Sequence, residues 1–313
     1  MTVWNGMDAF PRDAAPVVAT IGNYDGVHLG HRAILESVVA AARRRGLPSL
    51  VVTFDPHPLA IVAPSRRPRL LQTRRQKLDS LDGCGIGGVL ILRFDATFAA
   101  MTGEEFFRTF LRGRVTPAAI HVGASFRFGH DRAGDVDLLC RIGSEMGFEV
   151  VGVPQVAVSG EIVSSSAVRR IVEDGDVERA ARMLGRPFAL AGEVVAGDGR
   201  GRMLDFPTAN LDVENEMVPH RGVYVTESSV LSSRNPSVTN VGVRPTFGGE
   251  TLVVETHLID FDEDLLGERM EVRFLARLRD EKRFSGGDEL ADQIARDRAA
   301  AVAYFQGRDT AWP

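Results

Sequence analysis

The 313-residue chain is poor in cysteine and lysine and has no long hydrophobic run. Its two cysteines, Cys84 and Cys140, lack any Cys-x-x-Cys spacing, which favours two reduced side chains over a disulfide or a zinc site. No apolar stretch reaches membrane-spanning length, and the first residues lack the basic and apolar regions of a secretory signal. We therefore expect a cytoplasmic protein with no membrane partner.

Lysine occurs only as Lys77 and Lys282, so arginine supplies nearly all of the positive charge. Neither lysine follows the glycine pattern of a Walker-type phosphate loop, which excludes that class of nucleotide site. The formal net charge is −5, and the acidic excess lies after residue 185. Neither half is therefore a basic surface for nucleic acid. Backbone amides, histidine and arginine would have to hold any ATP.

Two patterns of secondary structure meet near residue 185. Before it, β-branched runs alternate with helical segments, which predicts a parallel sheet with crossover helices, an α/β domain of Rossmann-like form. The predicted strands are 17–21, 50–54, 88–94, 119–123 and 149–156. The predicted helices are 31–45, 73–82, 103–112 and 135–147, followed by two short helices within 164–184.

The second pattern has short strands without intervening helices. These predicted strands are 188–196, 222–230, 237–243, 251–259 and 269–277. Their even spacing predicts a small antiparallel β-barrel or sandwich, and a helical pattern from residue 287 to about 305 follows them. The length also favours two domains, which we predict over residues 1–185 and 186–313.

Residues 22–31, Gly-Asn-Tyr-Asp-Gly-Val-His-Leu-Gly-His, form a glycine-rich turn between a predicted strand and helix. The turn places backbone N–H groups, the positive end of a helix dipole and the side chains of His28 and His31 around one small volume. That volume suits a polyphosphate. Taken alone, the His-x-x-His spacing more often marks a metal-ligand pair or two histidines satisfied by backbone at a helix start, and the strand, glycine turn and helix around it favour the phosphate site.

A second glycine-rich segment, residues 197–210, ends in Pro-Thr-Ala-Asn. By itself it is typical of a flexible hairpin loop. It lies between the predicted strands 188–196 and 222–230.

An ordered series of motifs resembles those of the bacterial bifunctional riboflavin kinase/FAD synthetase family. The turn at 22–31 is similar to the Gly-x-Phe-Asp-x-x-His-x-Gly-His signature of nucleotidylyltransferases. Segments 53–58, 122–129 and 163–169 resemble further motifs of the adenylyltransferase domain. Motifs of the riboflavin kinase domain are matched by segments 197–210, 219–224, 240–247, 255–258 and 277–284.

The resemblance spans about residues 16–305 and implies two Mg²⁺-dependent reactions. Riboflavin and ATP would give FMN in a carboxy-terminal barrel, and FMN and ATP would give FAD and pyrophosphate in an amino-terminal domain. The expected partners are these small molecules, with no nucleic acid, as a monomer or weak homo-oligomer.

The resemblance also implies roles for individual residues. In FAD formation, His28, His31 and Arg169 would be catalytic. The residues expected to bind ATP there are Gly22, Asn23, Tyr24, Asp25, Gly26, Gly30, Gly123, Ser125, Ser164, Ser165 and Ser166. In FMN formation, Glu255 would be the general base, and Thr208 and Asn210 would bind Mg²⁺ and phosphate. Gly201 and Arg202 would also bind phosphate, and Arg279, Glu281 and Phe284 would contact the flavin.

Three residues depart from the family pattern: Ser125 replaces Asp or Asn, Asp205 replaces glycine, and Leu266 replaces tyrosine. One alternative is therefore an FMN adenylyltransferase with an impaired kinase module. A second is another transferase of the superfamily, acting on pantetheine phosphate or glycerol phosphate, which would leave Pro-Thr-Ala-Asn without a role. A third is a non-enzymatic flavin or nucleotide sensor, against which the retained histidines and Glu255 argue.

Overall fold

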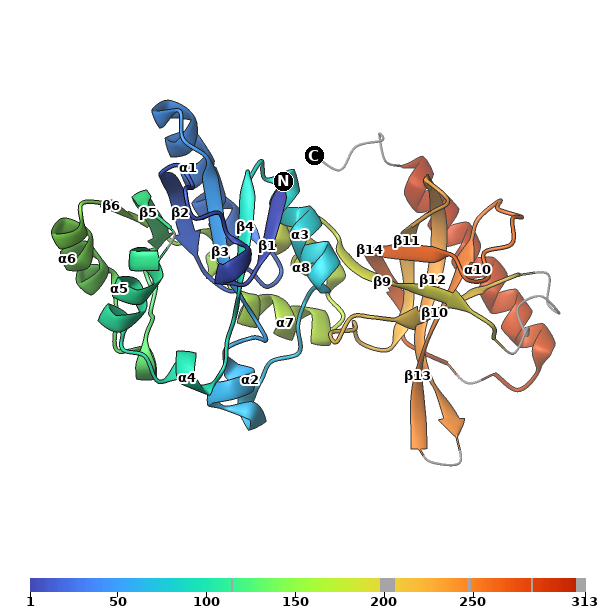
Figure 1. The fold of residues 1–313 in the computed structure, drawn as a ribbon. Helices are drawn as coiled ribbons and strands as arrows, with labels where there is room; N and C mark the ends of the chain where they lie inside the picture. The colour runs from blue at the N-terminus through green and yellow to red at the C-terminus, as the bar shows by residue number, and fades with distance from the viewer. Residues whose placement is uncertain (114, 198–205, 247–248, 283, 308–313) are drawn as a thin grey trace. The chain divides into compact units, whose positions relative to one another are not determined.

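Two compact units make up the computed structural model of the chain (Figure 1). The described residues are 1–113, 115–197, 206–246, 249–282 and 284–307. The first unit comprises Met1–Arg69 and Arg74–Ser164, and the second comprises Leu70–Thr73 and Ser165–Pro313. The expected division between residues 185 and 186 stays a prediction.

A six-stranded parallel sheet forms the centre of the first unit, in the order β1-β4-β3-β2-β5-β6. Its strands are Thr2–Asn5 (β1), Val17–Ile21 (β2), Ser49–Asp55 (β3), Gly88–Arg93 (β4), Pro117–Gly123 (β5) and Glu149–Val153 (β6). A separate two-stranded ribbon is formed by Ala157–Val158 (β7) and Glu161–Ile162 (β8).

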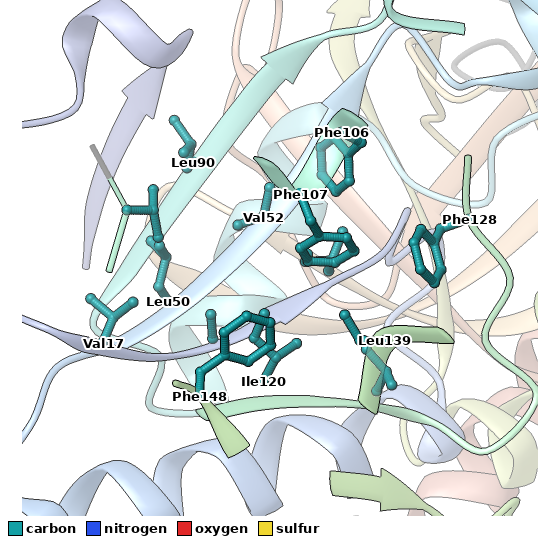
Figure 2. Close-up of a cluster of buried hydrophobic side chains, with 14 of the residues drawn as sticks. Val17, Leu50, Val52, Leu90, Phe106, Phe107, Ile120, Phe128, Leu139 and Phe148 are labelled. Atoms are coloured by element: carbon teal, nitrogen blue, oxygen red, sulfur yellow. The ribbon is translucent and has the colours of Figure 1, made fainter. Parts of the chain in front are cut away.

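Helices cover both faces of this sheet. They are Leu29–Arg45 (α1), Leu59–Val62 (α2), Arg74–Gly83 (α3), Ala96–Ala99 (α4), Gly103–Gly113 (α5) and Val136–Met146 (α6). Alternate side chains of β2 enter opposite cores: Val18 packs with α1 and α3, whereas Val17 and Ala19 pack with α5 and α6. Figure 2 shows the latter core, where Phe107 and Phe148 lie with ring centroids 6.4 Å apart. Burial on both faces explains why the strands are nearly continuous apolar runs.

The strand order of the first unit reverses between β2 and β5. The connections after these two neighbouring parallel strands therefore lead away in opposite directions. A crevice opens at such a reversal, outside the carboxyl ends of the strands, and open α/β sheets bind ligands there. The segments that follow Ile21 and Gly123 both lie at this edge.

A closed antiparallel barrel forms most of the second unit, in the order β10-β13-β12-β11-β14-β9. Its strands are Phe188–Val195 (β9), Ala209–Val213 (β10), Gly222–Val230 (β11), Ser233–Thr246 (β12), Gly249–Leu258 (β13) and Arg269–Arg279 (β14). The helices of this unit are Ser165–Glu173 (α7), Val177–Leu184 (α8) and Gly287–Gln306 (α10).

The two sides of the barrel wall differ in chemistry. On the outer side, Val225 and Leu275 pack against Ala301, so that α10 covers an apolar face. Side chains alternate between the two sides of a strand, so Thr226, which follows Val225 in β11, faces the inside of the barrel. Five fully buried hydroxyls form a chain there with spacings of 2.8 to 2.9 Å, in the order Ser228, Ser237, Thr226, Thr239 and Thr256. Because a hydroxyl both donates and accepts, this chain satisfies its own buried groups.

The fold confirms the predicted α/β domain followed by a barrel and a carboxy-terminal helix. Four strands were not predicted, namely β1, the short β7 and β8, and β10. Strand β1 lies at the sheet edge and has no fully buried residue, so it shows no alternating pattern. Strand β10 begins in the last two residues of the second glycine-rich segment and has polar Asn210 and Asp212, which are depleted in strands. Gly201, Arg202 and Asp205 lie outside the described residues.

Candidate active sites

The turn between β2 and α1 holds the first candidate site. Its backbone is left-handed at Tyr24, Gly26 and Val27, with φ values of 51°, 89° and 37°. The turn ends at His28, which is the N-cap of α1 and accepts a hydrogen bond at Nδ1 from the His31 N–H at 3.2 Å. Because Nδ1 is an acceptor, the neutral His28 ring has its proton on Nε2 and donates from that atom.

The two histidine rings of this turn lie face to face. Their centroids are 3.7 Å apart with an interplanar angle of 13°, and the Tyr24 ring lies 5.0 Å from that of His31. His28 is only 5 % exposed. Stacking and burial fix both rings before any ligand binds, so they are preorganised groups rather than mobile surface histidines.

Tyr24 is buried beside His31. Its hydroxyl lies 2.5 Å from Thr20 Oγ1, and burial raises the pKa of the phenol. The side chain therefore stays neutral and holds the turn to β2. Gly22 supports the same packing, because a Cβ there would approach the Tyr24 ring to 3.1 Å. The expected contribution of Tyr24 to ATP binding stays a prediction.

Other predicted segments of the first unit reach the same sheet edge. Gly123 ends β5, and Ser125 follows it and accepts a hydrogen bond from Gln155 Nε2 at 3.4 Å. A Cβ on Gly30 would lie 3.4 Å from the Val163 carbonyl oxygen, so the residue before Ser164 lies beside the start of α1. The first unit thus brings the glycine turn and the Val163–Ser164 segment together.

Ser165 and Ser166 begin α7, and Arg169 lies one turn later in that helix. All three belong to the second unit. Their predicted action on ATP stays a prediction from the motif.

The second candidate site lies on the barrel wall. Asn210 of β10 is paired directly with Glu255 of β13, and Asn240 of β12 is paired with Glu255 from the other side. The Glu255 carboxylate accepts a hydrogen bond from Arg244 Nη2 at 3.0 Å, and both side chains are about one-third exposed, at 31 % and 33 %. Thr208 lies two residues before Asn210, so these five polar residues share one region of the barrel wall.

Two glycines permit close approach at this second site. A Cβ on Gly197 would overlap the Asn210 amide, and one on Gly242 would overlap the Glu281 carboxylate. A side chain at either position would displace a predicted site residue. Glu281 therefore lies over the strand that carries Asn240, and its predicted contact with the flavin stays a prediction.

Arg279 forms the best-buried ion pair among the described residues with Asp297 of α10. Its Nη2 and Nε donate to the carboxylate at 2.7 to 3.1 Å, and Gln293 donates to the same group at 2.9 Å. The guanidinium carbon also lies 5.9 Å from the centroid of the Phe284 ring. Arg279 thus joins the end of β14 to both Phe284 and α10.

A cavity of about 520 Å³ lies beside the Pro-Thr-Ala-Asn segment and was not predicted. It is lined by Phe206, Pro207, His257, Leu258, Asp260, Phe261, Asp262, Ala295 and Arg298. His257 Nδ1 donates to the Pro207 carbonyl at 2.9 Å, and Nε2 is buried with no hydrogen-bond partner among the described residues. Burial lowers the pKa of His257, so the ring is neutral and Nε2 is an acceptor.

Comparisons with known proteins match both parts of the chain. A family model described as FAD synthetase matches residues 10–167, and one described as riboflavin kinase matches residues 184–305. The bifunctional riboflavin kinase/FMN adenylyltransferase of Escherichia coli strain K12 is 41 % identical over 92 % of each chain. The chain belongs to this bifunctional family.

Further relatives extend the match. The bifunctional riboflavin kinase/FMN adenylyltransferase of Bacillus subtilis strain 168 is 31 % identical over 94 % of each chain. A crystal structure from Streptococcus pneumoniae, titled as a macrolide-efflux protein, has a TM-score of 0.88 at 29 % identity, covering 96 % of this chain and 99 % of that one. In the described part of this chain, no helix combines the length and apolar character of a membrane span.

Membership in the bifunctional riboflavin kinase/FMN adenylyltransferase family confirms the predicted function. The enzyme phosphorylates riboflavin to FMN with ATP, and it transfers an adenylyl group from ATP to FMN to form FAD. Matches to both domains favour two activities over the single-activity and sensor alternatives.

Proposed function

We propose that the two reactions occur at two separate sites, one in each unit. FAD forms at the turn that carries His28 and His31, and FMN forms where Asn210 is paired with Glu255 across two strands. The observation that supports this most directly is that the two clusters share no residue and lie in different units.

In FAD formation, a phosphate oxygen of FMN attacks the α-phosphorus of ATP, and pyrophosphate leaves. This reaction requires alignment and stabilisation of growing oxygen charge rather than a covalent intermediate. We assign His28 Nε2–H and the stacked His31 ring to the α-phosphate and the leaving pyrophosphate. The glycine turn and the amino terminus of α1 supply backbone N–H groups for the other phosphate oxygens.

In FMN formation, the ribityl 5′-hydroxyl of riboflavin attacks the γ-phosphorus of ATP. We assign Glu255 as the base that takes the hydroxyl proton as the new bond forms. Arg244 holds the carboxylate in place.

The donor set beside Glu255 fits Mg²⁺. This ion prefers oxygen ligands and keeps several waters, so it needs few protein groups. The Thr208 hydroxyl and the Asn210 amide oxygen are such groups. Among the described residues, no cluster of three or more His, Cys, Asp or Glu forms a metal site. We therefore propose that Thr208 and Asn210 share the ion with ATP phosphates, whose charge the bound ion would offset.

The cavity beside Pro207 is suited to the adenine of the kinase ATP. Its walls offer the Phe206 ring and the neutral His257 acceptor, whose rings lie 5.7 Å apart. An adenine amino group can donate to His257 Nε2 and give this buried atom the partner it lacks. The flavin would then lie toward Glu281 and Phe284, with Arg279 ordering that segment through Asp297.

The test uses full-length protein with riboflavin, ATP and Mg²⁺, and chromatography to separate FMN from FAD. His31→Ala is expected to lower FAD formation at least 100-fold and to leave FMN formation within twofold, because its donor acts only in adenylyl transfer. Glu255→Ala is expected to lower FMN formation by about 10²- to 10⁴-fold while FAD still forms from added FMN.

Two matched variants serve as controls. His130→Ala removes an exposed histidine of the first unit, and Glu193→Ala removes an exposed strand carboxylate of the barrel. Both are expected to keep both activities. Equal loss of both activities in folded His31→Ala or Glu255→Ala would contradict the proposal of two separate sites.

A further inference from the structure

Lys77 is a basic residue of the first unit to which none of the steps above assigns a role. The chain has 37 Lys and Arg residues, and only Lys77 and Lys282 are lysines. Lys77 lies on α3 and is half-buried, whereas Lys282 is exposed. A lysine inside a unit whose other cations are arginines indicates a place that suits a compact point charge better than a planar guanidinium.

The ammonium of Lys77 faces the glycine turn. Its Nζ lies 3.5 Å from the Asn23 carbonyl oxygen and 3.4 Å from Thr53 Oγ1. Thr53 Oγ1 itself donates to the same Asn23 carbonyl at 3.2 Å. Lys77 and Thr53 therefore hold one carbonyl of the turn, at the carboxyl ends of β2 and β3.

Two carboxylates and one cation surround this ammonium. Asp25 of the turn and Asp55 at the end of β3 attract the charge, and Arg74 of α3 opposes it. Asp25 is only 5 % exposed. A buried carboxylate within a turn that receives a polyphosphate is electrostatically unfavourable unless a nearby cation offsets it.

We propose that Lys77 is a positioning residue of the FAD-forming site, whose ammonium offsets Asp25 and holds the Asn23 carbonyl so that the turn accepts the ATP phosphates. The inference rests on the proposed location of FAD formation at this turn. Lys77 acts through the turn and does not itself touch the reacting atoms.

The charge of Lys77 gives the proposal a pH signature. Burial lowers the pKa of Lys77, and Asp25 and Asp55 only partly reverse this effect. The ammonium therefore loses its proton below the ordinary lysine value as pH rises. The other titratable or charged groups near this ammonium are Asp25, Asp55 and Arg74, with His57 beside Asn23, and Tyr24 keeps its proton because burial raises its pKa. FAD formation should thus fall on the alkaline side as Lys77 is neutralised.

The experiment compares Lys77→Gln, Lys77→Arg and Arg75→Gln in the full-length enzyme, with FAD formation from added FMN measured from pH 7 to 10.5. Lys77→Gln keeps a hydrogen-bond donor without the charge and is expected to lose at least tenfold in FAD formation, with FMN formation unchanged. Lys77→Arg is expected to keep more activity and to move the alkaline fall to higher pH. Arg75→Gln removes an exposed charge of the same helix and is expected to match the wild type.

Either of two results would overturn the role of Lys77: FAD formation within twofold of the wild type in Lys77→Gln, or the same alkaline fall in Lys77→Arg as in the wild type. If both variants fail to fold, a wild-type profile without an alkaline fall is sufficient to reject it. His31→Ala separates this failure from that of the proposed site. If His31→Ala abolishes FAD formation and Lys77→Gln does not, only the Lys77 inference fails.

Discussion

The two candidate sites are built in different ways. The FAD-forming turn is one contiguous segment, and its order comes from an N-cap, stacked rings and a buried tyrosine. The proposed FMN-forming site is assembled from residues of β10, β12, β13, β14 and α10, and ion pairs such as Arg244 with Glu255 and Arg279 with Asp297 connect them.

This difference follows from the backbone that each fold offers. A parallel sheet ends in unpaired N–H groups at a helix start, which bind phosphate with little help from charged side chains. A closed barrel pairs its strands and leaves few free N–H groups, so side chains on neighbouring strands must provide the charge. We therefore expect the loss of a charged side chain to impair the barrel site more than the turn. The loss of a helix N-cap should impair only the turn.

The largest expected effect is on the buried ion pair of the barrel unit. Asp297→Ala leaves the Arg279 guanidinium without its carboxylate, at side-chain exposures of only 15 % and 8 % for the two partners. Removing one partner of such a pair costs about 3 kcal/mol. Hydrogen exchange of β14 and α10 peptides should therefore become faster, whereas peptides of α1 should not change.

Arg108→Ala is the matched control in the first unit, because it removes an exposed pair with Glu104. No measurable change in exchange is expected there. If Asp297→Ala left the exchange of α10 unchanged, the ion pair would not be what joins this helix to the end of β14.

The same difference explains what could be predicted from sequence. The proposed FAD-forming site lies in one run, residues 22–31, so the turn and the start of α1 followed from local glycine, histidine and helix patterns. Strand β10 was missed because Asn210 and Asp212 are poor strand formers; its pairing to β9 on one side and to β13 on the other makes it a strand. The cavity beside Pro207 was missed because its walls come from separate strands, loops and α10.

The ion pairs were equally inaccessible from local patterns. Arg279 and Asp297 are both ordinary surface types, and an arginine-rich chain offers many pairs of opposite charge. Only the docking of α10 on the barrel selects this pair. Lys77 could have been singled out by its rarity, but its contact with Asn23 depends on how α3 packs against the ends of β2 and β3.

A smaller effect than that of Asp297→Ala is expected at the cavity beside Pro207. There a neutral hydrogen-bond acceptor, His257 Nε2, rather than an ion pair would bind the ligand. His257→Leu removes the Nε2 acceptor and should raise the KM for ATP in FMN formation about tenfold, which corresponds to about 1.4 kcal/mol, within the range for one unsatisfied buried polar group. The KM for ATP in FAD formation should not change. Because burial lowers the pKa of His257, the wild-type KM should rise only at pH values below the ordinary histidine value, where Nε2 gains a proton.

His257→Gln is the control for this prediction, since its amide can both donate to the Pro207 carbonyl and present an acceptor. It should restore part of the ATP affinity. If folded His257→Leu kept the wild-type KM for ATP in FMN formation, the proposal that adenine binds in this cavity would be wrong.

The smallest expected effect separates the structural and chemical roles of His28. His28→Ala removes the N-cap acceptor of α1, which costs about 1 kcal/mol and should speed exchange of the His31 amide. His28→Asn keeps a cap acceptor and should protect that amide nearly as well as the wild type, yet it lacks the stacked ring and its Nε2–H donor. FAD formation should therefore fall to a similar extent in both variants, although their stability differs. If His28→Asn kept full FAD formation, the ring would serve only as a cap, and the turn would depend on backbone alone.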